Sequence, residues 1–189
     1  MNLEEYKIEL LSDFDELINF YTGKDKMDDF LHNHLQDCEE SHYCKTFCVR
    51  LKANNTIVAI FALAFDSVDI DSDDFDDMRI GAAGTDLPAV KETFRDQFEQ
   101  KYTYPALEIA YLAIDQKFQS LHIGSALVDE IASMARKQRY ADCVFLTVRA
   151  WHTSNYSAVG FYEKNQFAKL TSVAQMDVWP MYKTIWPIE

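Results

Sequence analysis

Helical periodicity marks several segments of the chain. Over Lys26–Glu40 and over Ile123–Lys137, apolar residues recur at spacings of three and four, which predicts helices with one apolar face. After Ser12 an acidic stretch favours a helix N-terminus, because negative side chains complement the helix dipole. Two further helices are expected over Leu87–Gln100 and Ser154–Lys164.

Continuous apolar runs predict the strands. Thr46–Leu51 and Thr56–Phe65 are joined by Asn54 and Asn55, which tolerate the positive φ of a tight turn, so a β-hairpin is expected. Four more runs predict strands at Leu107–Ile114, Cys143–Arg149, Phe167–Val173 and Val178–Trp186. Because helices alternate with strands in the C-terminal half, the pattern predicts an α/β layer with at least one parallel strand pair.

Residues 66–103 look like an acidic helical insertion between two strands of the sheet. The segment 69–77 contains six Asp in nine residues and begins with the spacing of a calcium loop. However, its sixth position is Asp74, where the loop needs Gly, and its twelfth is Ile80, where it needs Glu. The segment therefore favours a solvated acidic loop or a helix start.

Length, charge and cysteine content restrict the class of protein. The 189 residues suit a single domain spanning 1–189. With 18 Lys and Arg against 31 Asp and Glu, the net charge is −13, so nucleic acid is not an expected partner. No basic and apolar leader is visible and no apolar run reaches the ~20 residues of a membrane span, which favours a cytoplasmic protein without membrane contact.

The cysteines are too sparse for a disulfide framework and are interpreted as free thiols. Three of them lie near His32, His34 and His42, but their spacing matches no standard zinc motif, so no metal site is expected. The four cysteines are Cys38, Cys44, Cys48 and Cys143.

The junction of residues 115–126 leads from a predicted buried strand into a predicted helix. A helix N-terminus presents unpaired backbone N–H groups and positive dipole charge, which suits a phosphate or pyrophosphate. Gly124 and the small Ser125 and Ala126 would let a ligand approach the backbone closely. One such junction is a weak signal by itself, since many serve only the fold.

Two runs of residues in the C-terminal half are informative together: Gln119-x-x-His122-x-Gly124 and the segment 155–167. The first run is similar to the acyl-CoA pattern Q/R-x-x-G-x-G/A of the GCN5-related N-acetyltransferase (GNAT) family. The segment 155–167, NYSAVGFYEKNQF, is similar to the second pattern, N-x-x-A-x-x-F-Y-x-x-x-G-F. The order and spacing of the two motifs match over residues 104–170. The resemblance implies the GNAT-like acyl-CoA N-acyltransferase fold, an α/β fold whose mixed, mostly antiparallel central sheet is flanked by helices.

The resemblance also implies which residues bind acetyl-CoA as cosubstrate. The backbone of Leu112, Ala113 and Ile114 would pair with the pantetheine arm, in a gap between strands ending near Ile114 and Arg149. Asn155 would hydrogen-bond to the pantetheine. The amides that would hold the pyrophosphate belong to Gln119, Ser120, Leu121, His122, Ile123, Gly124 and Ser125.

Two residues are candidates for catalysis. Tyr162 would lie beside the thioester sulfur and protonate the departing thiolate, since a phenol can act as a general acid. Glu108 is the only carboxylate in the strongest apolar strand, and burial would raise its pKa and make it a base for an ammonium substrate. Alternatively, Tyr162 is a packed core aromatic, and Glu108 faces solvent or pairs with an Arg.

The sequence departs from the family patterns at two places. His122 stands where the first pattern has Gly, and Gln166 replaces the Gly before Phe167. Only His122 lies in the segment expected to bind the cofactor, where its side chain could crowd the pyrophosphate or contact a phosphate.

The sequence thus predicts an N-acetyltransferase that passes acetyl from acetyl-CoA to a small-molecule or protein amine by direct attack in a ternary complex. The acidic surface would attract a cationic acceptor. Two alternatives stay open: a toxin-like acetyltransferase of aminoacyl-tRNA, and a catalytically silent acyl-CoA-binding module. A homodimer is compatible with either.

Overall fold

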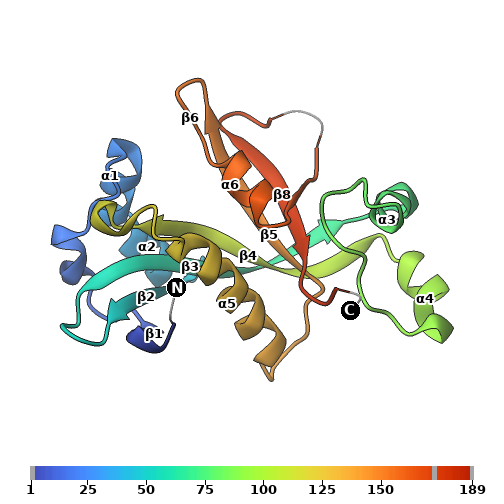
Figure 1. Ribbon diagram of the computed structural model, residues 1–189, viewed down its shortest axis with the longest axis horizontal. Coiled ribbons are helices and arrows are strands. Elements are labelled where there is room, and N and C mark those ends of the chain that lie inside the picture. The colour runs from blue at the N-terminus through green and yellow to red at the C-terminus, as the bar shows by residue number, and fades with distance from the viewer. Residues whose placement is uncertain (1–2, 172–173, 188–189) are drawn as a thin grey trace. The chain divides into compact units, whose positions relative to one another are not determined.

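The computed structural model describes residues 3–171 and 174–187. Hydrogen bonds join the strands of one mixed sheet in the order β1-β2-β3-β4-β5-β8-β7, with β6 pairing β5 (Figure 1). The chain forms two compact units: the first comprises residues up to Ala64 together with Ile109–Asp129, and the second comprises Phe65–Glu108 and the chain from Glu130. Each unit is described by itself. The mixed α/β sheet agrees with the predicted fold class.

The N-terminal strands of the first unit are antiparallel. They are β1 (Tyr6–Leu10), β2 (Lys45–Leu51) and β3 (Ile57–Asp69), whose last five residues belong to the second unit. The predicted hairpin is confirmed, and Asn55 in its turn has a φ of 63°. The strand β1 was not predicted, although Tyr6, Ile8 and Leu10 alternate with charged residues as an edge strand requires.

Short helices cover the N-terminal part of the first unit. The helix expected after Ser12 is a 3₁₀ helix, η2 (Phe14–Asn19), preceded by η1 (Leu3–Glu5). The helix predicted over Lys26–Glu40 is divided at His34, whose φ of −133° separates α1 (Asp25–Asn33) from α2 (Leu35–Glu40). Their apolar faces pack in one buried cluster with β2, β3 and β4; its buried members are Leu11, Leu17, Phe20, Leu31, Leu35, Cys48, Ile60 and Ala113.

The second unit contains the predicted parallel strand pair. The strand β4 (Thr103–Ile114), whose last six residues belong to the first unit, runs parallel to β5 (Phe145–Thr153), with Glu108 opposite Thr147. Antiparallel β8 (Val178–Thr184) pairs with β5 on its other side. The short strands β6 (Tyr156–Ser157) and β7 (Ala168–Lys169) complete the unit, and residues 172–173 of the predicted strand Phe167–Val173 lie outside the described residues.

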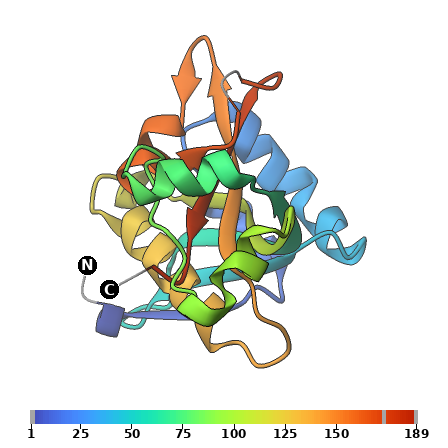
Figure 2. The ribbon, with the colours of Figure 1, turned by 90° about the vertical axis from the view of Figure 1, so that its right-hand side faces the viewer.

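The acidic insertion carries two helices, α3 (Ser72–Arg79) and α4 (Glu92–Glu99), shown in green and yellow-green in Figure 2. The predicted helix start is confirmed, since Asp71 and Asp74 form a capping box at the N-terminus of α3. The insertion is shorter than predicted because β3 extends to Asp69. The helix predicted from Leu87 is also shorter, since Pro88 forms an isolated β-bridge with Pro187.

The remaining helices are η3 (Gln116–Phe118), α5 (Ile123–Lys137) and α6 (Val159–Lys164). The limits of α5 agree with the prediction. The helix predicted over Ser154–Lys164 is wrong in its first part, because β5 continues to Thr153 and turns back into β6 before α6 begins.

All four cysteines are free thiols, as predicted. None of the helices in the described ranges, 3–171 and 174–187, combines the length and apolar character needed to cross a membrane.

Candidate active site

The segment 115–122 of the first unit is held by side chains that bond to the backbone. Asp115 is the N-cap of η3, where its Oδ1 accepts a hydrogen bond from the Lys117 amide at 2.9 Å. The Gln119 amide Nε2 donates to the carbonyl oxygens of Thr22, at 2.8 Å, and Ile114, at 3.0 Å. The Gln119 side chain therefore supports the turn and anchors it to the end of β4.

The same segment contains two left-handed residues. Ser120 has a φ of 64° and His122 a φ of 59°, a region that glycine enters without the strain that a Cβ brings. The acyl-CoA pattern has Gly at the His122 position, and the backbone of this chain keeps the conformation that glycine favours. The His122 side chain is exposed.

The first turn of α5 follows directly. Ala126 donates the first intrahelical hydrogen bond, to His122 at 3.2 Å, so the amides of Ile123, Gly124 and Ser125 precede the helical ladder. Free amides at the N-terminus of a 15-residue helix suit an anion such as a pyrophosphate. Leu112, Ala113 and Ile114 end β4 in this unit, with Ala113 buried and the other two half-buried.

Glu108 lies in the second unit among polar groups on neighbouring strands. It is 9% exposed, and its Oε1 lies 3.7 Å from Nε of the exposed Arg149. Burial raises the pKa of Glu108, the negative charge of Asp66 raises it further, and Arg149 opposes both effects. A carboxyl group with a raised pKa can accept a proton from an ammonium group more readily than an ordinary glutamate.

Two neighbours of Glu108 were not predicted. Thr147 pairs with Glu108 in the β4–β5 register, and its hydroxyl donates to Oδ2 of Asp66 at 2.5 Å. Asp66 belongs to β3 rather than to the insertion. The signal was in the sequence: Val68 and Ile70 are buried while Ser67 and Asp69 are exposed, an alternation that extends the strand past Phe65.

Tyr162 is buried in α6, with 6% of its surface exposed. Its ring makes edge contacts with Phe161 and Phe167, at centroid distances of 5.0 and 5.2 Å. Burial raises the pKa of the Tyr162 phenol well above its usual range, with a smaller contribution from Tyr156. The phenol is protonated at neutral pH, as an ordinary tyrosine is, and the raised pKa makes it a weaker acid than an exposed tyrosine.

Asn155 lies in the exposed turn between β5 and β6 and not in a helix, contrary to the prediction. Its backbone amide donates to Oγ1 of Thr153 at 3.4 Å. At the other end of the motif, Gln166 has a φ of 65°, so it also occupies a left-handed position where the family pattern has Gly. A search of the sequence for glycine would miss both left-handed turns, because His122 and Gln166 occupy the positions where the family patterns have Gly.

The structure groups some of the predicted residues and not others. Glu108 shares a polar cluster with Asp66, Thr147 and Arg149, and Gln119 bonds to Ile114. Tyr162 has mainly aromatic neighbours. Within the described residues, no three His, Cys, Asp or Glu side chains are grouped to hold a metal ion.

Several solved structures are similar to this chain. The crystal structure of AtaTR bound with AcCoA has a TM-score of 0.66 at 16% identity, covering 96% of this chain and 95% of that one. A Tyr-to-Phe mutant of the KacT protein has a TM-score of 0.65 at 14% identity, covering 96% and 95%. AtaT with acetyl-methionyl-tRNAfMet has a TM-score of 0.60 at 16% identity, covering 93% of each chain.

At these low identities, the TM-scores of 0.60 to 0.66 show a shared fold. No curated protein matches the chain by sequence. The model of the acetyltransferase (GNAT) family matches residues 11–167, which include β2 to β5, α5 and α6. The chain therefore belongs to the acetyltransferase (GNAT) family.

Proposed function

We propose that this acetyltransferase transfers acetyl from acetyl-CoA to a primary amine by direct attack, with both substrates bound at once. Members of the family are acetyl-CoA-dependent enzymes, and this chain is one of them. The observation that carries the proposal is the position of Tyr162: it is the tyrosine of the second family motif and lies buried in α6, where its phenol can supply the proton that a departing thiolate requires.

Glu108 is the proposed base. Its carboxylate takes one proton from the acceptor ammonium, directly or through a water molecule, and so frees the nitrogen lone pair. The nitrogen then forms a bond to the acetyl carbonyl carbon, and the carbon–sulfur bond breaks. Tyr162 gives its phenolic proton to the thiolate that leaves, and the second proton of the nitrogen returns to the Tyr162 oxygen through water. The proton held by Glu108 passes to solvent, so the products are an amide, free CoA with a thiol group and one released proton.

The proposed pyrophosphate site is the turn of residues 119–125. The amides that precede the first α5 hydrogen bond, together with the helix dipole, favour an anion there. Gln119 contributes by holding the turn, since its side chain is already bonded to Thr22 and Ile114. The backbone of Leu112, Ala113 and Ile114 is proposed to pair with the pantetheine arm, and Asn155 to bond to it.

The first experiment measures CoA release from acetyl-CoA with a panel of acceptors: diamines, a lysine-containing peptide and an N-terminal amine. Release that depends on an amine and yields the acetylated product supports the proposal. Tyr162→Phe should abolish most of this turnover while acetyl-CoA still binds. Turnover equal to that of the unaltered enzyme would remove Tyr162 from the mechanism.

A second candidate acceptor is the free α-amine of an aminoacyl-tRNA. It is favoured by the similarity to AtaT, which was solved with acetyl-methionyl-tRNAfMet. The prediction that nucleic acid is not a partner gains no support from that finding. The net charge of −13 opposes tRNA binding, because phosphates are attracted by cationic surfaces.

The two acceptor classes are separated by adding methionyl-tRNA to the panel and by measuring tRNA binding at two salt concentrations. Acetylation of the tRNA-bound amino acid, with binding that weakens steeply as salt rises, favours the second candidate. If the protein binds acetyl-CoA but acetylates no member of the panel, it is a silent binding module. The free thiols fit the reducing cytoplasm, where we place the reaction.

A further inference from the structure

The second unit contains a pocket of about 330 Å³ beside α3. It lies between the acidic insertion and the segment that follows Tyr162. Asp74 and Asp77 line it from α3, Glu163 and Phe167 from α6 and the turn after it, and Lys169 and Tyr182 from β7 and β8. This volume is at the lower end of the range for small-molecule sites.

The lining carries uncompensated negative charge. Glu163 is neutralised by Lys169, whose Nζ lies 2.8 Å from its Oε1. Asp74 uses one oxygen to accept the Asp71 amide at 3.0 Å. Burial and the neighbouring aspartates raise the pKa of Asp74, with burial the larger cause. Within the described residues, the Asp77 carboxylate makes no hydrogen bond or ion pair, so the two α3 carboxylates lack a cation.

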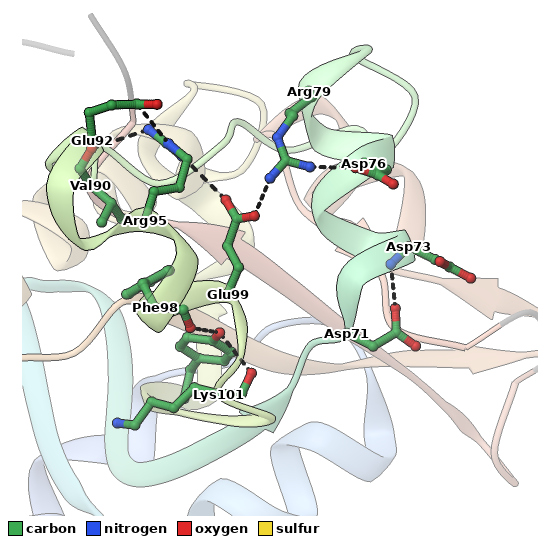
Figure 3. Close-up of polar contacts among 11 residues, drawn as sticks. Asp71, Asp73, Asp76, Arg79, Val90, Glu92, Arg95, Phe98, Glu99 and Lys101 are labelled. Atoms are coloured by element: carbon green, nitrogen blue, oxygen red, sulfur yellow. Dashed lines mark hydrogen bonds and ion pairs between the residues drawn. The ribbon is translucent and has the colours of Figure 1, made fainter.

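The arginines of the insertion are engaged elsewhere. Figure 3 shows that Arg79 bridges Asp76 of α3 and Glu99 of α4. Arg95 bonds to Glu99 at 3.4 Å and to the Val90 carbonyl at 3.1 Å. These contacts fix α3 against α4. Neither Arg79 nor Arg95 forms an ion pair with Asp74 or Asp77.

Tyr182 is the second observation that points to a ligand. It is 2% exposed and lies in β8 beneath α3, where Phe145 packs on its ring at 5.7 Å. Its hydroxyl makes no hydrogen bond with the described residues, although its ring is otherwise enclosed. Because Tyr182 lines the pocket together with Asp74 and Asp77, its hydroxyl opens into the pocket beside the two carboxylates.

We propose that this pocket binds a small linear diammonium compound. Asp77 accepts a hydrogen bond from one ammonium group, Asp74 and the Tyr182 oxygen accept hydrogen bonds from the other, and the apolar lining of Phe167, Ala82 and Ala83 packs on the methylene chain. A bare divalent cation suits the pocket less well, since it needs six or more oxygen ligands and Phe167, Ala82 and Ala83 supply only carbon from their side chains. Neither Glu108 nor Tyr162, the proposed catalytic pair, lines this pocket.

The test is titration calorimetry with 1,4-diaminobutane at neutral pH, without acetyl-CoA. Asp77→Asn should weaken binding at least tenfold, because it removes the unpaired charge. Tyr182→Phe should weaken it about threefold, as expected for one lost hydrogen bond. Asp73→Asn is the matched control, because it removes the same charge from the exposed start of α3 outside the pocket. Equal affinities for Asp77→Asn and Asp73→Asn would overturn the proposal.

Two further arms identify the source of any heat. Glu108→Gln should leave the affinity unchanged; if it abolishes binding while Asp77→Asn does not, the probe occupies the acceptor site, and this proposal fails while the proposed function stands. Magnesium chloride should give no comparable heat, and an equal response to it would mean a nonspecific counterion site.

Because Tyr182 is in the core, thermal unfolding of each variant is measured, and Asp77→Asn decides the outcome if Tyr182→Phe is unfolded. Absence of heat in the unaltered protein also refutes the proposal.

Discussion

The turn of residues 119–125 and the turn that follows α6 share an unusual backbone conformation but lie in different surroundings. Each contains a left-handed residue where the family pattern has glycine: His122, with φ 59°, and Gln166, with φ 65°. The first turn is exposed and held by polar side chains, among them Gln119. The second lies beside the aromatic contacts of Tyr162 and Phe167.

The difference in surroundings matches the proposed chemistry. An anion site needs backbone amides open to a ligand, which a polar, exposed turn supplies. The Tyr162 phenol is instead enclosed by aromatic side chains, which keep water away from it. Changes in the turn should therefore alter the affinity for acetyl-CoA, and changes near α6 should alter turnover.

Tyr162→Phe should have the largest effect. We expect kcat to fall by roughly 10²-fold or more, in the range typical for loss of a general acid, while the KM for acetyl-CoA changes less than twofold. Steady-state kinetics measure both constants. Tyr140→Phe, at a fully exposed tyrosine, is the control and should leave kcat unchanged. A large rise in KM with an unchanged kcat would show that Tyr162 only binds the cosubstrate.

Glu108→Gln should lower kcat/KM by roughly 10-fold to 100-fold and remove the acidic limb of its pH profile, because the base must be ionised to act. That limb should lie above the ordinary glutamate value of 4.5, since burial and Asp66 raise the pKa of Glu108. Asp66→Asn removes the nearby negative charge and should move the limb to lower pH. An unmoved limb in Asp66→Asn would show that another group titrates.

The same pKa shift has a consequence for folding stability. Because folding raises the pKa of Glu108, its stabilising contribution is present below about pH 4.5 and is lost as the pH rises through the folded-state pKa. The free energy of unfolding of Glu108→Gln should therefore rise relative to that of the unaltered protein as the pH increases above about 4.5. Urea unfolding at a series of pH values measures this difference, and a difference that shrinks with rising pH would contradict it.

Gln119→Ala should weaken acetyl-CoA binding about fivefold to tenfold, because two hydrogen bonds that hold the turn are lost, each contributing about 1 kcal/mol or less to its order. Calorimetry with CoA measures the affinity. Gln116→Ala is the matched control, because it makes the same change three residues earlier, in η3. Equal affinities for the two variants would show that Gln119 does not position the turn.

His122→Gly and Gln166→Gly should have the smallest effects. Each substitution removes the strain of a left-handed non-glycine residue, which stabilises the fold by about 1 kcal/mol. Glycine also gives the unfolded chain more conformational entropy, which lowers the free energy of unfolding by about 0.5–1 kcal/mol. Stability should thus change by less than about 1 kcal/mol, as urea unfolding can measure. Asn165→Gly is a contrasting change, at negative φ and with a side-chain bond to the Phe161 carbonyl, and it should destabilise clearly.

The sequence by itself determined the elements whose patterns are local. The periodicity of α5 and the Asn55 hairpin turn follow from spacing and turn chemistry, because one helix face or one turn is encoded by neighbouring residues. The order of strands and helices along the chain was enough to predict a parallel pair such as β4–β5. The two motifs also sufficed to identify the family. Where local patterns competed with packing, as at His34 or Pro88, the predicted helix limits were wrong.

Only the tertiary structure decided the surroundings of the candidate residues. Glu108 gains Asp66 and Thr147 as neighbours because β3 and β5 bring together positions about forty residues away on either side along the chain. The pocket beside α3 likewise joins Asp77 to Tyr182, which no local pattern relates. A pKa depends on burial and on charges that are near in space, and these quantities exist only after distant segments have packed together.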